Sequence, residues 1–278
     1  MPEGDTVHKI ANFLAPRLEG RVVVAVRMAD AAGARECSGR RVTGVHARGK
    51  HLYIDFDSDR VLRSHLGMYG SWHSYAPEEA WRKPRRQASL VVSTDDQVFV
   101  CFNAKEVELV RSPSVRERIG RSRLGPDLIA DGVGTEAIVR RARDILEEDA
   151  LLADALLDQR VACGIGNVYK SEVLFLEGWS PQTRLGDLAD GDLARCFATA
   201  ADLLRRNLGG GRRVTRFVAD GAGRLWVYGR RGKPCLRCEA PVVSTRLGRH
   251  HRSTYWCPTC QTRQRSEKRP AEAGVGPC

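Results

Sequence analysis

The 278-residue sequence contains no apolar run that approaches the length of a helix that crosses a lipid bilayer, about 20 residues. Near its start it also lacks the apolar stretch of a secretory signal peptide, and the carboxylates Glu3 and Asp5 occur there instead. These two absences exclude a membrane-spanning chain. They predict no membrane partner and a cytoplasmic location.

Acidic residues are in deficit, because Asp and Glu number 34 against 45 Lys and Arg, which gives a formal net charge of +11. Such an excess favours a polyanionic partner, most simply nucleic acid, and binding that weakens as salt rises. Some basic chains are merely soluble, so charge alone does not decide the function. The length is sufficient for two domains and a sizeable core.

Four of the nine cysteines form two pairs near the end of the chain, with two residues inside each pair and eighteen between the pairs: Cys235, Cys238, Cys257 and Cys260. Each pair can reach one small cation from a tight turn, and two turns complete a tetrahedron around one structural zinc ion. A redox pair, or a chance occurrence of the spacing, is the alternative. Since all four ligands are thiolates, no position remains for water, and the metal is expected to hold shape only. The remaining cysteines are scattered, as in proteins of a reducing cytosol.

Two further segments favour nucleic acid. The segment between the cysteine pairs is a basic hairpin that carries Arg246, Arg249, His250, His251 and Arg252, although a solvated charged turn is the alternative. The turn Gly164–Asn167 precedes a helix whose free N–H groups suit a phosphate, although a plain helix connector is equally compatible with it.

The first part of the sequence combines one helix with many short strands. Asp5 or Thr6 is expected to cap the helix, and its apolar face comprises Val7, Ile10, Ala11, Leu14 and Leu18. Alternating apolar residues predict strands at 21–28, 51–56, 61–66, 88–93 and 97–102, the first with Val22, Val24, Val26 and Met28 on one face. Tight turns are expected at 48–50 and 67–70. The pattern is typical of a β-sandwich or barrel with the helix packed on it.

The second part is helical up to the zinc segment. Thr135 is expected to cap a helix with Ile138, Ala142, Ile145 and Leu146 inward, and further helices are expected near 151–156, 169–176 and 187–208. The chain is therefore predicted to be an α+β multidomain protein. Its expected parts are a sandwich domain at 1–115, a linker at 116–134, a helical domain at 135–211, a zinc-finger domain at 212–262 and a disordered tail at 263–278.

Five motifs in order resemble one family, the formamidopyrimidine-DNA glycosylase and endonuclease VIII family of base-excision repair enzymes. The motifs are PEGDTV at 2–7, RGKHL at 48–52, GIGNVYKSEVLF at 164–175, VYGRRGKPC at 227–235 and RSTYWCPTCQ at 252–261. The resemblance covers about residues 1–262. It implies an N-terminal β-sandwich with a leading helix, a helix-two-turn-helix domain and a C-terminal four-cysteine zinc-finger hairpin, in agreement with the interpretation above.

The resemblance also implies the roles of matching residues. Removal of Met1 would expose Pro2 as a secondary amine that attacks C1′ of the deoxyribose, and the resulting iminium drives strand scission by β,δ-elimination. Glu3 would act as a general acid. Lys50 and Arg252 would grip phosphates near the lesion, with Arg252 implicated in the second elimination. Asn167, in the turn with Gly166, would contact phosphate.

An enzyme of this kind must extrude its target base, and the gap left in the duplex has to be filled. Met68 and Tyr69 align with the wedge loop of the family and are the candidates. Two core side chains in a β turn are the alternative.

Three departures from the formamidopyrimidine branch favour the endonuclease VIII branch in its actinobacterial form. Residues 102–107, which read FNAKEV, lack the Arg and Phe of the Arg-Arg-Phe-Gly stretch that invades the helix in that branch. The loop at 218–224 is short, and Thr6 stands where the family often has glutamate. The expected substrate is therefore damaged double-stranded DNA with oxidised pyrimidines or abasic sites, with single-stranded or bubble DNA left open. The expected protein is a monomer associated with a bacterial nucleoid. An AP lyase with little glycosylase activity and a non-catalytic damaged-DNA-binding protein are the alternatives.

Overall fold

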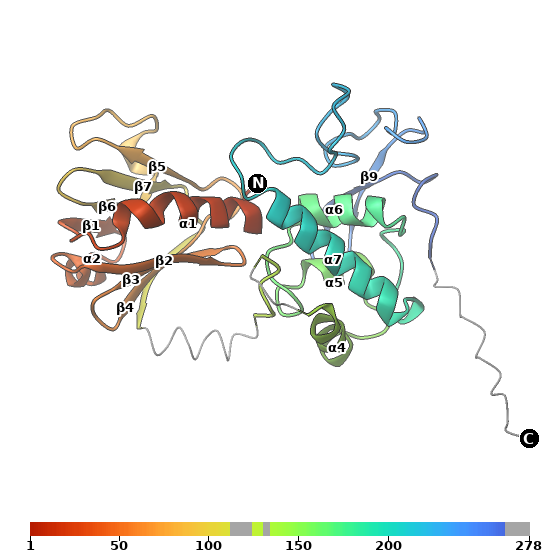
Figure 1. The fold of residues 1–278 in the computed structure, drawn as a ribbon, viewed down its shortest axis with the longest axis horizontal. Helices are drawn as coiled ribbons and strands as arrows, with labels where there is room; N and C mark the ends of the chain where they lie inside the picture. The colour runs from red at the N-terminus through yellow and green to blue at the C-terminus, as the bar shows by residue number, and fades with distance from the viewer. Residues whose placement is uncertain (112–123, 130–133, 265–278) are drawn as a thin grey trace, which may run out of the picture. The chain divides into compact units, whose positions relative to one another are not determined.

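The computed structural model describes residues 1–111, 124–129 and 134–264 (Figure 1). Most of the expected linker at 116–134 and most of the expected tail at 263–278 therefore lie outside the described residues. Contacts within the chain divide it into two units. The first comprises Met1–Val133, Asp158–Gly166 and Ala201–Arg213, and the second comprises Gly134–Leu157, Asn167–Ala200 and Val214–Cys278.

The first unit contains two four-stranded antiparallel sheets, which confirms the predicted β-sandwich. One sheet has the order β1-β6-β7-β5, with β1 at Ala25–Met28, β5 at Ser71–Tyr75, β6 at Ala88–Ser93 and β7 at Val98–Phe102. The other has the order β2-β3-β4-β8, with β2 at Val42–Arg48, β3 at His51–Phe56, β4 at Arg60–His65 and β8 at Glu106–Arg111.

Helix α1, Gly4–Leu18, lies beside β2 and β3 and contributes Leu14 and Leu18 to the core of this unit (Figure 1). Leu52 and Ile54 of β3 and Phe99 of β7 belong to the same core. The inward faces of α1 and β3 were therefore predicted correctly. On each element the apolar residues recur with the period of a helix or a strand, so they all lie on one face and pack against the same core. Two short helices also belong to this unit: α2 at Ala31–Cys37 and the 3₁₀ turn η1 at Arg85–Gln87.

The predicted strand 21–28 is wrong in its first half. Val22 and Val24 are 42% and 60% exposed, whereas Val23 is fully buried. The backbone of Val23 is bonded to Gly39 and Arg40, so this stretch pairs with the segment after α2 before β1 begins. A change of pairing partner changes which face of the chain points inward.

The predicted cap of α1 is also wrong. The N-cap is Glu3, whose carbonyl accepts the N–H groups of Thr6 and Val7, so that the helix begins before either predicted cap. Asp5 is instead buried in the first turn.

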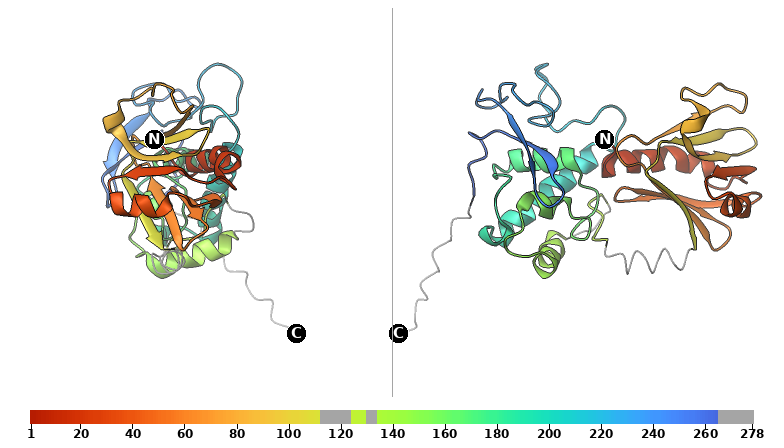
Figure 2. Two further views of the ribbon diagram at one scale, coloured as in Figure 1. Left: turned by 90° about the vertical axis from the view of Figure 1, so that its left-hand side faces the viewer. Right: turned by 180° about the vertical axis from the view of Figure 1, so that it is seen from behind.

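The second unit contains four helices among the described residues, and its zinc hairpin follows them. The helices are α4 at Thr135–Ile145, α5 at Leu152–Leu157, α6 at Asn167–Leu176 and most of α7 at Asp190–Arg206, with a 3₁₀ turn η2 at Leu185–Asp187. Strands β9 at Val243–Leu247 and β10 at Arg252–Trp256 form the antiparallel hairpin. Strand β10 packs against α6 (Figure 2).

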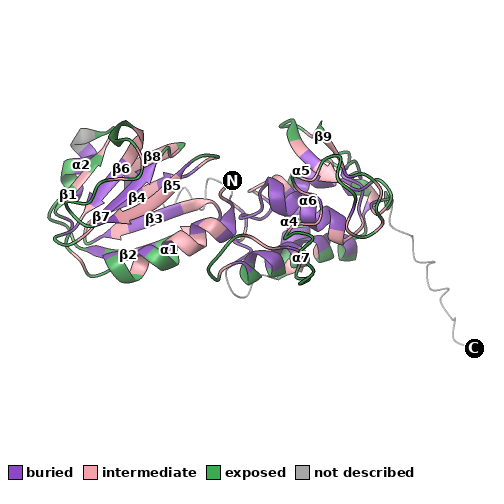
Figure 3. Ribbon diagram, turned by 90° about the horizontal axis from the view of Figure 1, so that it is seen from above, coloured by how far each residue is buried: buried purple, intermediate pink, exposed green. Residues whose placement is uncertain are grey.

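Helix α6 is the centre of the second unit, because every residue from Asn167 to Phe175 is buried (Figure 3). Helix α4 differs in two details from its prediction. Its N-cap is Gly134, with Thr135 as the first helical residue, and Ile145 is 36% exposed at its end. In the part of the chain that the structure describes, no helix has the length and apolarity to cross a membrane.

Candidate active site and zinc centre

The chain start is fixed by the buried carboxylate of Glu3. This side chain is fully buried, and its Oε2 accepts the backbone N–H of Gly166 at 2.8 Å. Its neighbour Pro2 is half-buried just ahead of α1. The carboxylate is therefore held in one place directly beside the residue that the sequence predicts to be the nucleophile.

Glycines make this close approach possible. The N–H of Gly4 donates to the carbonyl of Gly164 at 2.9 Å, and a Cβ on Gly4 would lie 2.8 Å from the Cα of Gly164. A Cβ on Gly166 would lie 2.3 Å from Cδ of Glu3. Gly164 has φ +115°, a conformation that L side chains rarely adopt. The two motifs PEG and GIG therefore interlock, backbone against backbone.

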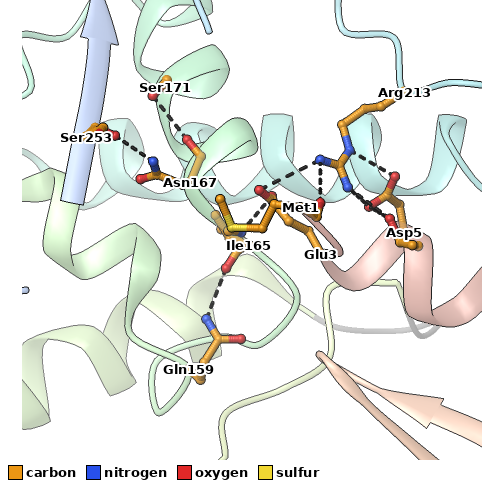
Figure 4. Close-up of polar contacts among 11 residues, drawn as sticks. Met1, Glu3, Asp5, Gln159, Ile165, Asn167, Ser171, Arg213 and Ser253 are labelled. Carbon is orange, nitrogen blue, oxygen red and sulfur yellow. Dashed lines mark hydrogen bonds and ion pairs between the residues drawn. The ribbon is translucent and has the colours of Figure 1, made fainter. Parts of the chain in front are cut away.

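The turn that carries these glycines is braced by the amide of Gln159. Its Nε2 donates to the carbonyl of Ile165 at 3.1 Å (Figure 4), and its Oε1 accepts the N–H of Gly164 at 3.2 Å. Both ends of one side chain are thus used on a single loop. The turn presents Gly166 to Glu3 with a fixed orientation.

Arg213 closes the other side of the chain start. Its Nε and Nη2 donate to the two oxygens of Asp5 at 3.0 and 2.5 Å, and Nη2 also donates to Thr6 Oγ1 at 3.1 Å. Its Nη1 lies 3.8 Å from Glu3 Oε1 and donates to the carbonyl oxygen of Met1 at 3.4 Å (Figure 4). The chain start is thus held between a glycine turn and a guanidinium.

Lys50 lies at the turn of the β2–β3 hairpin, as predicted. The preceding Gly49 has φ +57°, and its N–H donates to Asp127 Oδ2 at 2.6 Å. Asp127 also contacts His8 of α1 at 3.1 Å and accepts the N–H of Ile129. Burial alone would raise the pKa of Asp127, but the hydrogen bonds from His8, Gly49 and Ile129 outweigh it and lower the pKa. A buried carboxylate thus ties the hairpin turn to α1.

Two histidines lie close to Lys50. The rings of His51 and His65 are 4.8 Å apart, and Arg63 contacts His51 Nδ1 at 3.0 Å. Burial, followed by the nearby His65 and Arg63, lowers the pKa of His51 to about 3. Both rings are therefore neutral at pH 7, because burial also lowers the pKa of His65.

Met68 and Tyr69 occupy the turn between β4 and β5. Their side chains are 52% and 76% exposed, so the alternative of two core side chains is wrong. Gly67, which precedes them, has φ +62°. The loop presents two large side chains to solvent from a rigid sheet.

In the second unit, the side-chain amide of Asn167 is used internally. Its Nδ2 donates to the carbonyl of Ser253 at 2.6 Å, and its Oδ1 accepts from Lys170 Nζ at 2.7 Å. Lys170, which is 1% exposed, also donates to Thr254 Oγ1 at 2.6 Å, and that hydroxyl donates to the carbonyl of Arg252 at 3.3 Å. Since an ammonium can only donate, it directs the Thr254 proton toward Arg252. Helix α6 and the start of β10 are thereby joined.

A second buried charge anchors the approach to the zinc finger. Glu172 accepts the N–H groups of Trp226, Val227 and Tyr228 at 2.8 to 2.9 Å and the hydroxyl of Thr215. Burial raises the pKa of Glu172, although these donors oppose the shift. One carboxylate thus fixes the backbone that leads into the cysteine pairs.

The four cysteines form a compact group. Their sulfur atoms all lie within 4.8 Å of one another, with Cys235–Cys260 at 3.9 Å and Cys238–Cys257 at 3.4 Å. A tetrahedral ion with Zn–S bonds of about 2.3 Å separates its sulfurs by about 3.8 Å. The donor set and the spacing fit a structural zinc ion, as predicted.

The predicted site residues thus fall into two groups. Pro2, Glu3, Gly166, Lys50 and the Met68–Tyr69 pair belong to the first unit. Asn167, the exposed Arg252 at the start of β10 and the four cysteines belong to the second.

Sequence reasoning missed Arg213, Lys170, Asp127 and Glu172. Each of these charges is buried or nearly so and serves a partner distant in sequence. The sequence carried one weak signal, since Lys170 and Glu172 are charged residues within a helix that is mostly apolar.

Three family models match the chain in succession. They describe the formamidopyrimidine-DNA glycosylase N-terminal domain at residues 1–120, the H2TH domain of the same enzyme at 124–218, and a zinc finger found in FPG and IleRS at 232–263. The order agrees with the resemblance drawn from the motifs.

Relatives of similar length match over almost the whole chain. The Streptomyces coelicolor protein named "Probable endonuclease 8 2" is 39% identical, over 94% of each chain. The Mycolicibacterium smegmatis protein named "DNA-(apurinic or apyrimidinic site) lyase Nei2" is 37% identical, over 94% of this chain and 99% of its own. Both are actinobacterial, which confirms the predicted branch.

Among solved structures, Lactococcus lactis Fpg in a complex with DNA that contains N7-benzyl-Fapy-dG has a TM-score of 0.80 at 22% identity. The match covers 94% of this chain and 100% of that one. At this identity the likeness shows the fold.

Proposed function

The chain belongs to the formamidopyrimidine-DNA glycosylase and endonuclease VIII family, and on that premise we propose that it is a DNA glycosylase and AP lyase of base-excision repair. One observation carries the proposal: a fully buried Glu3 is fixed by the N–H of Gly166 directly beside Pro2. A buried carboxylate held at a chain start contributes little to a fold core, whereas a reaction at the N-terminal nitrogen requires an acid there.

The proposed nucleophile is the nitrogen of Pro2 after Met1 is removed. An α-amino group has a pKa of about 8, so a useful fraction of it is unprotonated at neutral pH. After a secondary amine adds to C1′, the adduct expels the oxygen or the base and becomes a cationic iminium, because a secondary amine cannot form a neutral imine. That cation acidifies the C2′ proton, and elimination then breaks the strand. Glu3 supplies the proton for the departing group.

The proposed substrate is damaged double-stranded DNA, with oxidised pyrimidines favoured over 8-oxoguanine. Lys50 and Arg252 are proposed to contact phosphates, with Arg252 supporting the δ step. The turn Gly166–Asn167 contributes through its backbone, since the Asn167 amide is used on Ser253 and Lys170. The exposed Met68 and Tyr69 fill the gap of the extruded nucleotide. Salt should weaken binding steeply.

We further propose that the protein works as a monomer in the bacterial cytoplasm, in association with the nucleoid. Its metal is one structural zinc ion held by Cys235, Cys238, Cys257 and Cys260. The ion stabilises the hairpin that carries Arg252, because a closed set of four thiolates leaves no position for a reacting oxygen.

Borohydride trapping tests the proposal. Enzyme incubated with an abasic duplex and borohydride should yield a covalent protein–DNA adduct, and Pro2→Gly or an uncleaved N-terminal tag should abolish it while DNA binding persists. A wild-type protein that binds the duplex and forms no adduct on any abasic or oxidised-base substrate is instead a non-catalytic damaged-DNA-binding protein.

A second candidate is an AP lyase with little glycosylase activity. Two observations favour it: a relative with 37% identity is named a lyase, and Thr6, where the family often has glutamate, is bonded to Arg213. Strand cleavage of an abasic duplex without excision from duplexes that contain thymine glycol, dihydrouracil or 8-oxoguanine would assign this narrower activity.

A further inference from the structure

The methionine that precedes Pro2 marks the space in which the proposed reaction takes place. The carbonyl carbon of Met1 is bonded to the Pro2 nitrogen, and its oxygen accepts a hydrogen bond from Arg213 Nη1 at 3.4 Å. When an N-terminal proline adds to an aldehyde, C1′ of the sugar takes the place of that carbon. The Met1 oxygen therefore stands in for the oxygen on C1′.

Arg213 is held firmly enough to act at this place. Two of its nitrogens, Nε and Nη2, form a paired contact with the carboxylate of Asp5, which is 1% exposed. The paired contact fixes the plane of the guanidinium and directs Nη1 toward Met1 and Glu3. The side chain of Arg213 is only 14% exposed, so water screens its charge weakly.

We propose that Arg213 is a catalytic residue that donates a hydrogen bond to the oxygen on C1′ as Pro2 adds to an abasic site. The inference rests on the proposed function and adds a residue to it. A preorganised donor at an oxygen that gains charge lowers the barrier to addition, as in an oxyanion hole. An arginine suits this role because it cannot lose its proton at neutral pH.

The steps balance without any further reagent. The Pro2 lone pair forms the N–C1′ bond while the π pair of the aldehyde moves to oxygen. The hydrogen bond from Arg213 stabilises the negative charge that this oxygen gains. The nitrogen loses its proton to solvent, and the oxygen takes one from Glu3, which lies 3.8 Å from Arg213. Solvent reprotonates Glu3, which then gives the oxygen a second proton. The oxygen leaves as water while the nitrogen lone pair forms the iminium, and solvent reprotonates Glu3 once more.

A purely structural role for Arg213 makes a different prediction. Among the groups that face its guanidinium are Asp5, Thr6, Glu3 and the Met1 carbonyl. If Arg213 only tied α1 to its own segment, its loss would lower stability and impair every property of the site together. A catalytic role would slow addition at C1′ and leave binding of a duplex without that oxygen unchanged.

The test compares Arg213→Met and Arg213→Lys with Arg17→Met, which removes one charge from an exposed position of α1. Full-length proteins are assayed for the borohydride trapping rate at saturating abasic duplex and for the Kd of a tetrahydrofuran duplex, which carries no hydroxyl or aldehyde oxygen on C1′. Arg213→Met should slow trapping about 100-fold, as loss of one oxyanion donor does elsewhere. Its Kd should stay within about twofold of that of Arg17→Met, and Arg213→Lys should recover part of the rate.

Equal trapping rates in Arg213→Met and Arg17→Met would overturn the inference, and so would parallel losses of trapping and of tetrahydrofuran binding in both Arg213 variants. Absence of an adduct with the wild-type protein would instead refute the proposed function itself. Thermal melting of each variant identifies any that fails to fold, and the lysine variant, which keeps the charge, then decides.

Discussion

Replacement of Gly166 by alanine should displace Glu3 without touching Pro2. The new Cβ would lie 2.3 Å from Cδ of Glu3, whereas ordinary contacts begin near 3.4 Å, so the carboxylate has to move by about 1 Å (3.4 − 2.3). That movement breaks the 2.8 Å hydrogen bond from Gly166, and a hydrogen bond to a charged group contributes about 1.5–3 kcal/mol. If that energy is lost in the transition state, excision should slow about 10- to 100-fold.

The assay is single-turnover excision from a thymine glycol duplex, with an abasic duplex in parallel. Gly191→Ala is the matched control, since nothing lies within 4 Å of its Cβ position in α7. It should leave the rate unchanged and stabilise the protein by about 0.5–1 kcal/mol. A Gly166→Ala protein that excises within about twofold of wild type would refute the idea that the position of Glu3 limits the reaction.

Three further predictions concern the rest of the molecule. Removal of zinc by a chelator, or Cys257→Ser, should abolish binding to an abasic duplex in a gel-shift assay, while the circular dichroism of the sandwich strands persists; unimpaired binding without metal would contradict the structural role. Between pH 6.5 and about 3 the unfolded chain binds a proton on His51 and the folded protein does not, so protonation of His51 lowers the free energy of unfolding by about 2 kcal/mol at pH 5. The midpoint of denaturant unfolding should therefore fall as pH drops below 6.5, and it should fall less in His51→Asn. Lys170→Met should lower the ratio of δ- to β-elimination product about tenfold, because it removes the hydrogen bond to Thr254 and so frees the Thr254 hydroxyl that holds the carbonyl of Arg252. Lys233→Met, at an exposed position, should leave the ratio unchanged. Equal ratios in the two variants would show that Lys170 does not act on Arg252.

Much of the fold could be predicted because the signals are local. Strand β3 alternates with inward Leu52, Ile54 and Phe56, and one sheet layer covers that face. The zinc site follows from the spacing of four thiols along the chain, which needs no knowledge of the tertiary structure. The prediction was wrong where a residue pairs with a segment that the local apolar period does not reveal. Val23 is the example, because its backbone forms hydrogen bonds with Gly39 and Arg40 and its side chain is therefore turned inward.

The residues of the candidate site could be predicted from the sequence, but the contacts that hold them in place could not. Pro2 and Glu3 were identified through a motif, yet nothing in the sequence tells that Gly166 supplies the N–H for Glu3 or that Arg213 holds Asp5. These contacts join residues 163 and 208 positions apart. The predicted cap of α1 at Asp5 was wrong for the same reason, since the carboxylate that could have capped the helix is bonded to Arg213 instead.

The attachment site of the trapped DNA tests the central claim most directly. The borohydride-reduced adduct would be digested with trypsin and nuclease, and the modified peptide would be sequenced by mass spectrometry. The account predicts a peptide that begins at Pro2, without Met1, and carries the sugar remnant on the proline nitrogen. A remnant on Lys50 or any other side chain, or an active protein that retains Met1, would contradict it.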